Sequence, residues 1–295
     1  MIRTEECIGC QACVAFCAQK AISFVYNEWG EGRAVVDPER CNGCGLCDAR
    51  CPAHTIGLHD AQPTVLAAFS KGNRHTGASG GVFFELASRF IGDGGVVFGA
   101  AFDDDLKLVH QKCTSVQELP RLCKSKYLHS DMTGVYTQIA DCLASGKQVM
   151  FVGTPCQVSA VKNLFGKRYA NRLLLIDFLC HGTGTQKVFD LCRQHEERRQ
   201  KGSMTDFVFR AKSKRAEHSF RYTLRRGGKD QAVAGYSFEF PYYYSYLKYT
   251  IFNDSCYTCQ YATAKRVGDI TLGDFGASKI MIRPCTIKRA FPCSR

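Results

Sequence analysis

The chain has 295 residues, of which 45% are hydrophobic and 22% are charged, and its formal net charge is +12. This composition is ordinary for a folded globular protein and excludes disordered and collagen-like chains. No run approaches the roughly 18 to 20 apolar residues that span a bilayer, and the first residues leave no space for a signal peptide. We therefore expect a cytoplasmic protein without a membrane span, in which the many cysteines stay reduced and can bind metal.

Eight cysteines near the N-terminus repeat one spacing twice. They are Cys7, Cys10, Cys13 and Cys17, then Cys41, Cys44, Cys47 and Cys51, the last followed by Pro52. This is the ligand pattern of bacterial ferredoxins with two [4Fe-4S] clusters, in which the fourth cysteine of each run serves the other cluster. The pattern predicts one cluster held by Cys7, Cys10, Cys13 and Cys51, and a second held by Cys41, Cys44, Cys47 and Cys17.

Zinc knuckles or a disulfide scaffold would also use clustered cysteines. A zinc site needs only four ligands, however, and gives no reason for two identical runs of four. The first run ends Cys17-Ala18 where the motif usually has proline. Since that proline does not touch iron, its absence weakens the match only slightly.

The positive charge favours an anionic partner or cofactor. Each cubane with four thiolates carries about −2 when oxidised, so two of them reduce the net charge to roughly +8. A redox protein or an anionic small-molecule electron carrier fits this excess. Nucleic acid does not, because neither a recognition helix nor a basic sheet with stacked aromatics is evident.

The chain divides into a ferredoxin-like domain over residues 1–60, with a hairpin in 21–36, and a larger body. A polar segment at 70–77 predicts a loop. Val82, Leu86 and Phe90 recur at helical spacing, and the glycines at 92–95 end this helix before a buried strand at 96–102.

The remaining segments predict a mixed sheet. We expect strands at 106–111, 148–152, 173–179 and 267–272, a helix at 135–143, and antiparallel strands at 207–210, 218–225 and 232–238. The fold class is therefore α+β: a bacterial ferredoxin-like domain followed by a mixed-sheet α/β body whose two parts are 70–152 and 153–295.

Four later cysteines stand out by context. Cys156 lies in a strand-to-helix turn and Cys180 follows a buried strand, so both are expected at carboxyl ends of strands, where α/β sheets bind ligands. Cys256 and Cys259 form a Cys-x-x-Cys pair. Together the four could hold a third [4Fe-4S] cluster, although Cys-x-x-Cys pairs also serve zinc and redox disulfides.

The body resembles the β subunit family of coenzyme F420 hydrogenases and dehydrogenases, which is itself similar to the plant 7-hydroxymethyl chlorophyll a reductases. The segments that carry the resemblance occur in the family's order: Ala78-Ser79-Gly80-Gly81, Ser125-Lys126-Tyr127, Gly153-Thr154-Pro155-Cys156-Gln157, Cys180-His181-Gly182, Cys256-Tyr257-Thr258-Cys259 and the strand 267–275. The resemblance implies that Cys156, Cys180, Cys256 and Cys259 bind a cluster near FAD.

The expected FAD residues combine this resemblance with simple physics. They are Ser79, Gly80, Gly81, Lys126, Tyr127 and Thr154. Backbone N–H groups at the start of the helix after Gly81 suit a pyrophosphate, and Lys126 could place a positive charge near a phosphate or the flavin ring. A simple turn and a surface lysine are the alternative readings of these two features.

Three further stretches have ordinary interpretations. The aromatic residues at 236–252 are expected to face the core, and the basic residues at 210–226 to form a solvated hairpin that could steer an acidic ferredoxin or an anionic cofactor tail. The stretch 279–295 shows no helical or strand period, and family members usually continue well past this point. We expect a truncated C-terminus after about residue 276.

Two functions follow from the sequence. The first is a flavin-dependent iron-sulfur oxidoreductase in which FAD gathers single electrons from the clusters for hydride transfer to or from an F420-like or other acceptor. The alternative is a non-catalytic electron-transfer subunit that connects a partner oxidoreductase within a hetero-oligomer.

Overall fold

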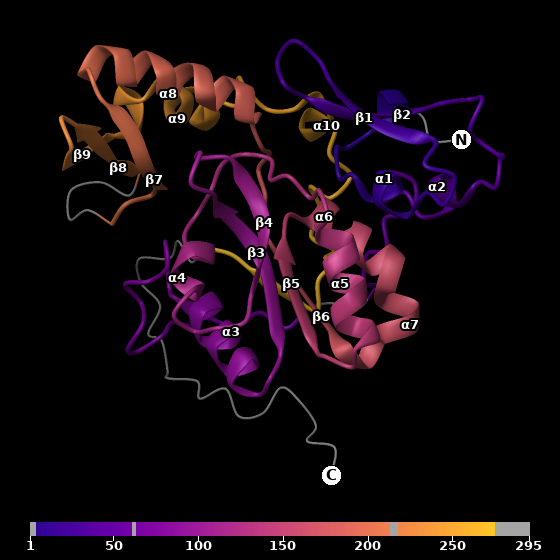
Figure 1. Cartoon of the computed structure of the whole chain (residues 1–295). Helices are drawn as coiled ribbons and strands as arrows, with labels where there is room; N and C mark the ends of the chain where they lie inside the picture. The colour runs from indigo at the N-terminus through magenta and orange to yellow at the C-terminus, as the bar shows by residue number, and fades with distance from the viewer. Residues whose placement is uncertain (1–3, 61–62, 213–217, 275–295) are drawn as a thin grey trace.

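The computed structural model describes residues 4–60, 63–212 and 218–274. Its N-terminal unit is small and contains one antiparallel hairpin, in which Ile22 lies opposite Val36 and Tyr26 opposite Gly32. The unit consists of η1 (Thr4–Glu6), α1 (Ala12–Phe16), β1 (Ile22–Tyr26), β2 (Gly32–Val36) and α2 (Leu46–Ala49). This is the expected ferredoxin-like arrangement, with each short helix following a cysteine loop and the hairpin between them (Figure 1).

The body is built on a five-stranded mixed sheet with the order β10-β6-β5-β3-β4. Its strands are β3 (Val96–Phe102), β4 (Leu108–Cys113), β5 (Val149–Gly153), β6 (Leu173–Phe178) and β10 (Ile270–Leu272). β4 runs antiparallel to β3, while β3, β5, β6 and β10 are parallel. The prediction of a mixed sheet is confirmed, and the sheet takes strands from both sides of residue 153.

Helices cover both faces of this sheet (Figure 1). One face is covered by α3 (Val82–Gly92) and α4 (Leu119–Leu122), and the other by α5 (Val135–Ala144), α6 (Pro155–Val161), η2 (Lys162–Gly166), α7 (Lys167–Tyr169) and η3 (Ala170–Arg172). The side chains of β3 alternate between the two layers: Val96 and Phe98 pack toward α5, whereas Val97 and Ala101 pack toward α3. A strand buried on both faces explains why β3 reads as a continuous apolar run.

A separate three-stranded sheet and two helices form the remainder of the body. Its elements are α8 (Gln186–Gln200), β7 (Ser203–Phe209), β8 (Ser219–Arg226), β9 (Lys229–Tyr236), η4 (Ser237–Glu239) and α9 (Pro241–Leu247). Gly227 and Gly228 both have positive φ and close a two-residue hairpin loop, as their sequence suggests. The aromatic stretch 236–252 faces the core only in part. Tyr242, Tyr243 and Tyr246 are buried, whereas other aromatic rings of this stretch are exposed.

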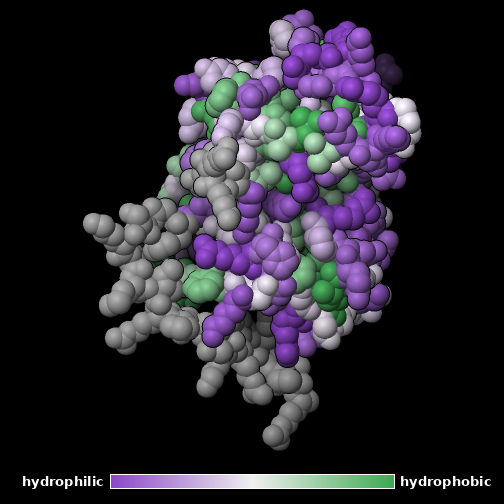
Figure 2. Space-filling model, turned by 90° about the vertical axis from the view of Figure 1, so that its left-hand side faces the viewer, coloured by the Kyte–Doolittle hydropathy of each residue, from purple (hydrophilic) through white to green (hydrophobic). Residues whose placement is uncertain are grey.

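The basic stretch at 210–226 is also not uniformly solvated. Arg210 is buried and forms an ion pair with Asp274, because it enters the body at the end of β7 instead of lying on the hairpin. Figure 2 shows mixed polar and apolar residues on the face that includes α3 and the small sheet. No helix within the described ranges combines the length and apolar character needed to cross a bilayer. The stretch 279–295 lies outside the described residues.

The ferredoxin-like unit packs against α5, α6 and the short helix α10 (Asp254–Tyr257). The side-chain oxygen of Gln11 accepts a hydrogen bond of 2.7 Å from the amide of Met132, just before α5. On the other side, Arg33 of β2 forms an ion pair of 3.2 Å with Asp254. Buried side chains of the unit, including Cys10 and Ala12, belong to the same apolar core as α5 and α6. The two parts therefore share a core.

Candidate metal centres

The two N-terminal cysteine runs have the same backbone conformation. Gly9 and Gly43, each just before the second cysteine of its run, both have φ of 71°. Gln11 (φ 62°) and Gly45 (φ 71°), each just after the second cysteine, are also left-handed and precede α1 and α2. Left-handed residues turn the chain sharply, so each run bends around its second cysteine. Equal spacing in the sequence has thus produced equal loops.

The first expected ligand set is brought together in the structure. Cys10 is only 6% exposed. Burial raises the pKa of its thiol well above the ordinary value; the amide of Ala12 opposes this, and the charges of Cys13, Cys7 and Cys51 add to it. Burial, and then the charges of Cys7 and Cys51, likewise raise the pKa of Cys13 to about 12. Cys51 comes from the second run, as the crossed ligand rule predicts.

These four thiols suit an iron-sulfur cluster. Hydrogen-bond donors point at their sulfur atoms: the amide of Ala34 lies 3.4 Å from the Sγ of Cys7, and the amides of Ala53 and His54 lower the pKa of Cys51 against the stronger effect of burial. Neighbouring thiols whose pKa values are raised by burial cannot ionise together unless positive charge is placed among them. Iron supplies that charge, and amide donors are the usual partners of cluster thiolates.

The second expected set lies closer to solvent. Cys17, Cys41 and Cys47 are half-buried and Cys44 is exposed. Cys47 is near enough to Cys13 for its charge to raise the pKa of that thiol, which places the second loop beside the first set. Ligation of a common cluster by Cys17, Cys41, Cys44 and Cys47 stays a prediction.

The four later cysteines also converge, at the carboxyl ends of β5 and β6. Thr154 caps α6 together with Gln157, and this places Cys156 in the first turn of the helix. Cys180 follows β6, and Cys256 and Cys259 lie in and after α10. Burial raises the pKa of Cys180 to about 12. A backbone hydrogen bond with Gly182 opposes this effect, and the charges of Cys256 and Cys259 add to it.

Cys156 is the most enclosed member of this later set. Burial raises the pKa of its thiol, a hydrogen bond with the Thr154 hydroxyl at 3.0 Å opposes this, and the charges of Cys180, Cys256 and Cys259 raise it further. The hydroxyl oxygen of Thr183 lies 3.8 Å from the Sγ of Cys256. A buried group of thiols with a hydroxyl donor fits a bound cluster for the reason that applies to the first set.

The arrangement of these cysteines bears on the alternatives of zinc and disulfides. All sixteen cysteines in the described residues are free thiols. Among those residues, no three His, Cys, Asp or Glu side chains surround a single metal-ion position. In a cubane each thiolate binds a different iron atom, so its four ligands stand around a larger body and not around one point. The lack of a single-ion position among the described residues therefore does not count against cubanes.

The expected FAD residues do not all lie together. Ser79, Gly80 and Gly81 precede α3, and Gly81 has a φ of 76°. A Cβ on Gly81 would lie 2.6 Å from the carbonyl oxygen of Asn73, so close packing by itself explains this glycine. Lys212 donates a hydrogen bond of 3.2 Å to the carbonyl of Ser79, which brings a positive charge to this loop. Thr154 lies elsewhere, beside Cys156.

Lys126 and Tyr127 connect these two places. The ammonium of Lys126 donates to the carbonyl oxygens of Arg121 (2.9 Å) and Cys123 (2.6 Å) at the end of α4. Burial lowers its pKa to about 7. The ring of Tyr127 stacks on Tyr246 with 4.3 Å between centroids, and the charge of Cys180 contributes to the raised pKa of Tyr246. Tyr127 thus lies near the later cysteines, and Lys126 is already partnered.

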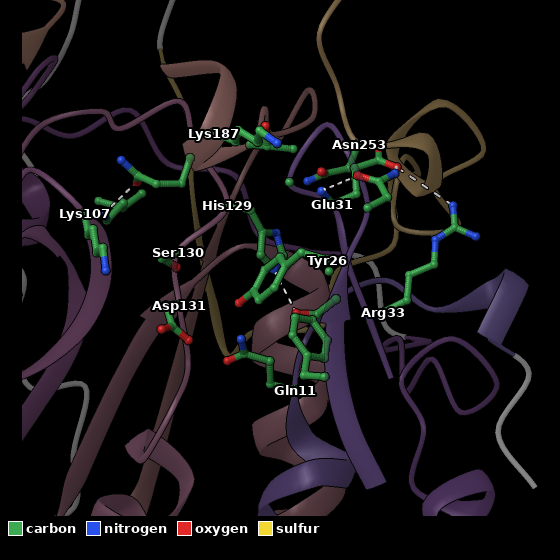
Figure 3. Close-up of a pocket in the computed structure, with 18 of the residues that line it drawn as sticks. Gln11, Tyr26, Glu31, Arg33, Lys107, His129, Ser130, Asp131, Lys187 and Asn253 are labelled. Atoms are coloured by element: carbon green, nitrogen blue, oxygen red, sulfur yellow. Dashed lines mark hydrogen bonds and ion pairs between the residues drawn. The ribbon is translucent and has the colours of Figure 1, made fainter. Parts of the chain in front are cut away.

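A cavity of about 630 Å³, which the sequence did not indicate, lies where the ferredoxin-like unit meets the body. Figure 3 shows Tyr26 and Gln11 facing His129 and Asp131 across it, with Lys107 and Lys187 near its rim. Cys7 and Ser255 also line it, so it touches residues next to both cysteine sets. His129 has no sequence motif around it, and only the folded chain brings it to this place.

Comparison with known proteins supports two parts of the chain. A family model for the C terminus of the beta subunit of coenzyme F420 hydrogenase/dehydrogenase matches residues 146–289, and a 4Fe-4S dicluster domain model matches residues 6–55. A 7Fe ferredoxin from Hydrogenibacillus schlegelii is 34% identical over 73 residues, which are 24% of this chain and 87% of that protein.

Two other relatives match more distantly or over a smaller share of their length. The ferredoxin-type protein NapF of Haemophilus influenzae is 36% identical over 53 residues, or 18% of this chain, and the match spans only 30% of NapF. A chain in a structure of the F420-reducing [NiFe] hydrogenase complex from Methanosarcina barkeri aligns with 12% identity and a TM-score of 0.43, covering 68% of each chain. The dicluster and β-subunit matches follow one another along the sequence. The chain therefore carries an N-terminal 4Fe-4S dicluster ferredoxin domain, and its residues 146–289 match the C-terminal part of the coenzyme F420 hydrogenase/dehydrogenase beta subunit.

Proposed function

We propose that this protein is an iron-sulfur flavoprotein that passes electrons between its ferredoxin-type clusters and FAD, with hydride transfer to or from an F420-like or other anionic acceptor. The observation that carries the proposal is the convergence of Cys156, Cys180, Cys256 and Cys259 next to the core shared with the ferredoxin-like unit. A chain that served only as a soluble ferredoxin would need no cysteine site in its body. The later set gives electrons a destination inside the same molecule.

The cysteines would hold three [4Fe-4S] clusters, which when bound supply reversible one-electron transfer. The protein's own contribution is to enclose and orient them. Cys10 is buried in the apolar core and Cys156 packs against it, which excludes water from one side of each site. The hydroxyl of Thr154 and the amide of Ala34 then stabilise thiolate charge at Cys156 and Cys7.

The FAD site is proposed at the loop before α3, extending toward Tyr127. The positive charges of Arg74, Lys124 and Lys212 influence one another there, which favours an anionic group such as a pyrophosphate. Lys126 would have to release the carbonyls of Arg121 and Cys123 to bind it directly. When bound, FAD supplies the step between one-electron and two-electron chemistry.

A non-catalytic electron-transfer subunit is the second candidate. The engagement of Lys126 with two carbonyl groups, and the separation of Thr154 from the Ser79 loop, both favour it. In this case the positive charge of the chain would serve to bind an acidic redox partner within a hetero-oligomer. Bound flavin decides between the two, because a pure carrier needs only iron.

The deciding experiment is anaerobic purification followed by counts of iron, sulfide and flavin per chain. Three clusters correspond to about twelve irons and two clusters to about eight. The variant Cys156→Ala should lose about four irons, whereas Cys142→Ala, a buried cysteine of the same core in α5, should lose none. About eight irons in both variants and in the parent chain would refute the third site, and absence of flavin would leave only the carrier function.

A further inference from the structure

Two buried tyrosines join the body to the loops that hold the first cysteine set. Tyr136 of α5 is 3% exposed and donates a hydrogen bond of 2.7 Å to the carbonyl of Cys10. Tyr261, 5% exposed, donates one of 2.6 Å to the carbonyl of Pro52, the residue after Cys51. Each phenol therefore bonds directly to the backbone of a cysteine of the first set or to its neighbour.

The same two rings lie near the later cysteine set. Tyr136 and Tyr261 share one apolar core with Cys10, and Cys156 and Cys259 pack against it. Burial raises the pKa of Tyr136 most, followed by the charges of Cys10 and Cys156. For Tyr261, burial is again the largest cause of the raised pKa; a hydrogen bond with Ser159 opposes it, and the charges of Cys156, Cys10 and Cys259 follow. Each ring thus lies within electrostatic reach of both sets.

A third connection runs through His129, at the wall of the cavity. Its Nε2 lies 3.1 Å from the carbonyl oxygen of Gly9, between Cys7 and Cys10, and its Nδ1 lies 3.4 Å from the hydroxyl of Thr183. A carbonyl only accepts hydrogen bonds, so Nε2 carries the proton and Nδ1 is the acceptor. Thr183 in turn lies 3.8 Å from the Sγ of Cys256. The contacts of His129 therefore run from the loop of the first set to Thr183, which lies beside Cys256 of the later set, while the single hydroxyl proton of Thr183 is used on Nδ1.

We propose that Tyr136 and Tyr261 are bridging residues between the first cysteine set and the later cysteine set. They fix these two sets relative to each other, and they fill the space between them with the packed, hydrogen-bonded atoms through which single electrons pass. This inference rests on the proposed function. In the exchange, a reduced cluster at one set loses one electron and an oxidised cluster at the other gains it. The exchange transfers one electron only, so no proton or other reactant is needed.

The ordinary alternative is that both phenols are simply satisfied core tyrosines, since a buried hydroxyl needs a partner in any case. The chain offers a matched control for this. Tyr242 is fully buried and donates a hydrogen bond of 2.8 Å to the carbonyl of Tyr127, but it belongs to the aromatic core of the small sheet, which contains no member of either cysteine set. Equivalent changes at Tyr242 should reproduce any purely structural effect.

The experiment uses the full chain with its clusters and the variants Tyr136→Leu, Tyr261→Leu and Tyr242→Leu, each with its Phe counterpart. Iron per chain and thermal midpoint are measured first. After laser photoreduction by an external one-electron donor, freeze-quench electron paramagnetic resonance then follows electron exchange between the sets, with the signal missing in Cys156→Ala identifying the later set.

We expect Tyr136→Leu and Tyr261→Leu to slow this exchange several-fold while the iron count stays at the parent value. Tyr136→Phe, which keeps the ring but loses the bond to Cys10, should have a smaller effect, and Tyr242→Leu should have none. Should a Leu variant fail to bind iron, its Phe counterpart carries the comparison. Unchanged exchange in iron-replete Tyr136 and Tyr261 variants, or equal slowing in Tyr242→Leu, would overturn the proposal. If the parent chain shows no resonance signal from the later cysteine set, the third cluster is overturned instead.

Discussion

Asp177 offers a quantitative test of how the chain after Cys259 is fixed to the sheet. It lies in β6, three residues before Cys180, and its side chain is fully buried. One carboxylate oxygen accepts from the guanidinium of Arg266 at 3.2 Å and from the amide of Gly268 at 3.3 Å, with the amide of Val267 at 3.4 Å. The other oxygen accepts from the hydroxyl of Thr271. A single carboxylate therefore satisfies four donors from one segment.

We expect Asp177→Ala to lower the free energy of unfolding by about 3 to 5 kcal/mol, because it leaves the charge of Arg266 unpaired in a largely buried position. The control is Asp60→Ala. Asp60 pairs with Lys265 at 3.1 Å in the same region, but both side chains are exposed (97% and 57%), so this ion pair should contribute no more than about 1 kcal/mol. The difference between the two variants isolates the effect of burial.

The assay is urea unfolding of the anaerobic holoprotein, followed by far-ultraviolet circular dichroism, with iron counted before unfolding. Under the proposed function, Asp177→Ala should also release iron from the later cysteine set, since Cys259 loses its tie to β6. The double variant Asp177→Ala, Arg266→Met removes the charge and its partner together, so it should recover part of the loss. Equal midpoints for Asp177→Ala and Asp60→Ala would refute this account of the segment.

Two further predictions concern titratable groups. Burial, with smaller contributions from the charges of His129 and Lys126 and an opposing one from the carbonyl of Val152, lowers the pKa of His110 to about 4. As the pH falls, the unfolded chain therefore binds the proton before the folded chain does. His110 should contribute up to about 3 kcal/mol of stability above pH 6.5 that is lost as the pH falls toward 4. The urea midpoint of His110→Gln should vary less with pH over this range than that of the parent chain, and parallel curves for the two proteins would contradict the assignment. Burial lowers the pKa of Lys126 to about 7, and an anionic phosphate that binds beside it should raise this pKa. FAD binding should therefore take up about half a proton near pH 7. Calorimetry in buffers of different ionisation enthalpy should detect this uptake in the parent chain and not in Lys126→Met.

Local patterns in the sequence predicted the loops and most strands well. The repeated spacing at Cys7 and Cys41 fixes two loops of equal conformation, because each needs only a few neighbouring residues and left-handed positions such as Gly9 and Gly43. The apolar run before Cys180 likewise predicts a central strand. Since the carboxyl ends of parallel strands meet at one edge, the proximity of Cys156 and Cys180 was also accessible from the sequence.

Contacts across long sequence separations were not accessible in this way. Tyr136 bonds to a residue 126 positions away and Tyr261 to one 209 positions away, and no spacing rule connects them. The observed partners of Lys126 were inaccessible for another reason. A sequence shows that a lysine is present but not where its ammonium points, and here two nearby carbonyl groups bind it.

Two of these long-range contacts involve the same segment of the chain, which links the two cysteine sets. Asp177 holds the segment after Cys259 to β6, and Tyr261, which lies in that same segment, holds Pro52 beside Cys51. The position of the first cysteine set thus depends on Asp177, which lies in β6 of the body. A change at Asp177 should therefore disturb the relation between the two sets as well as the later set alone. If the two cysteine sites are independent, Asp177→Ala should alter only the later set, and an unchanged first set in that variant would contradict this coupling.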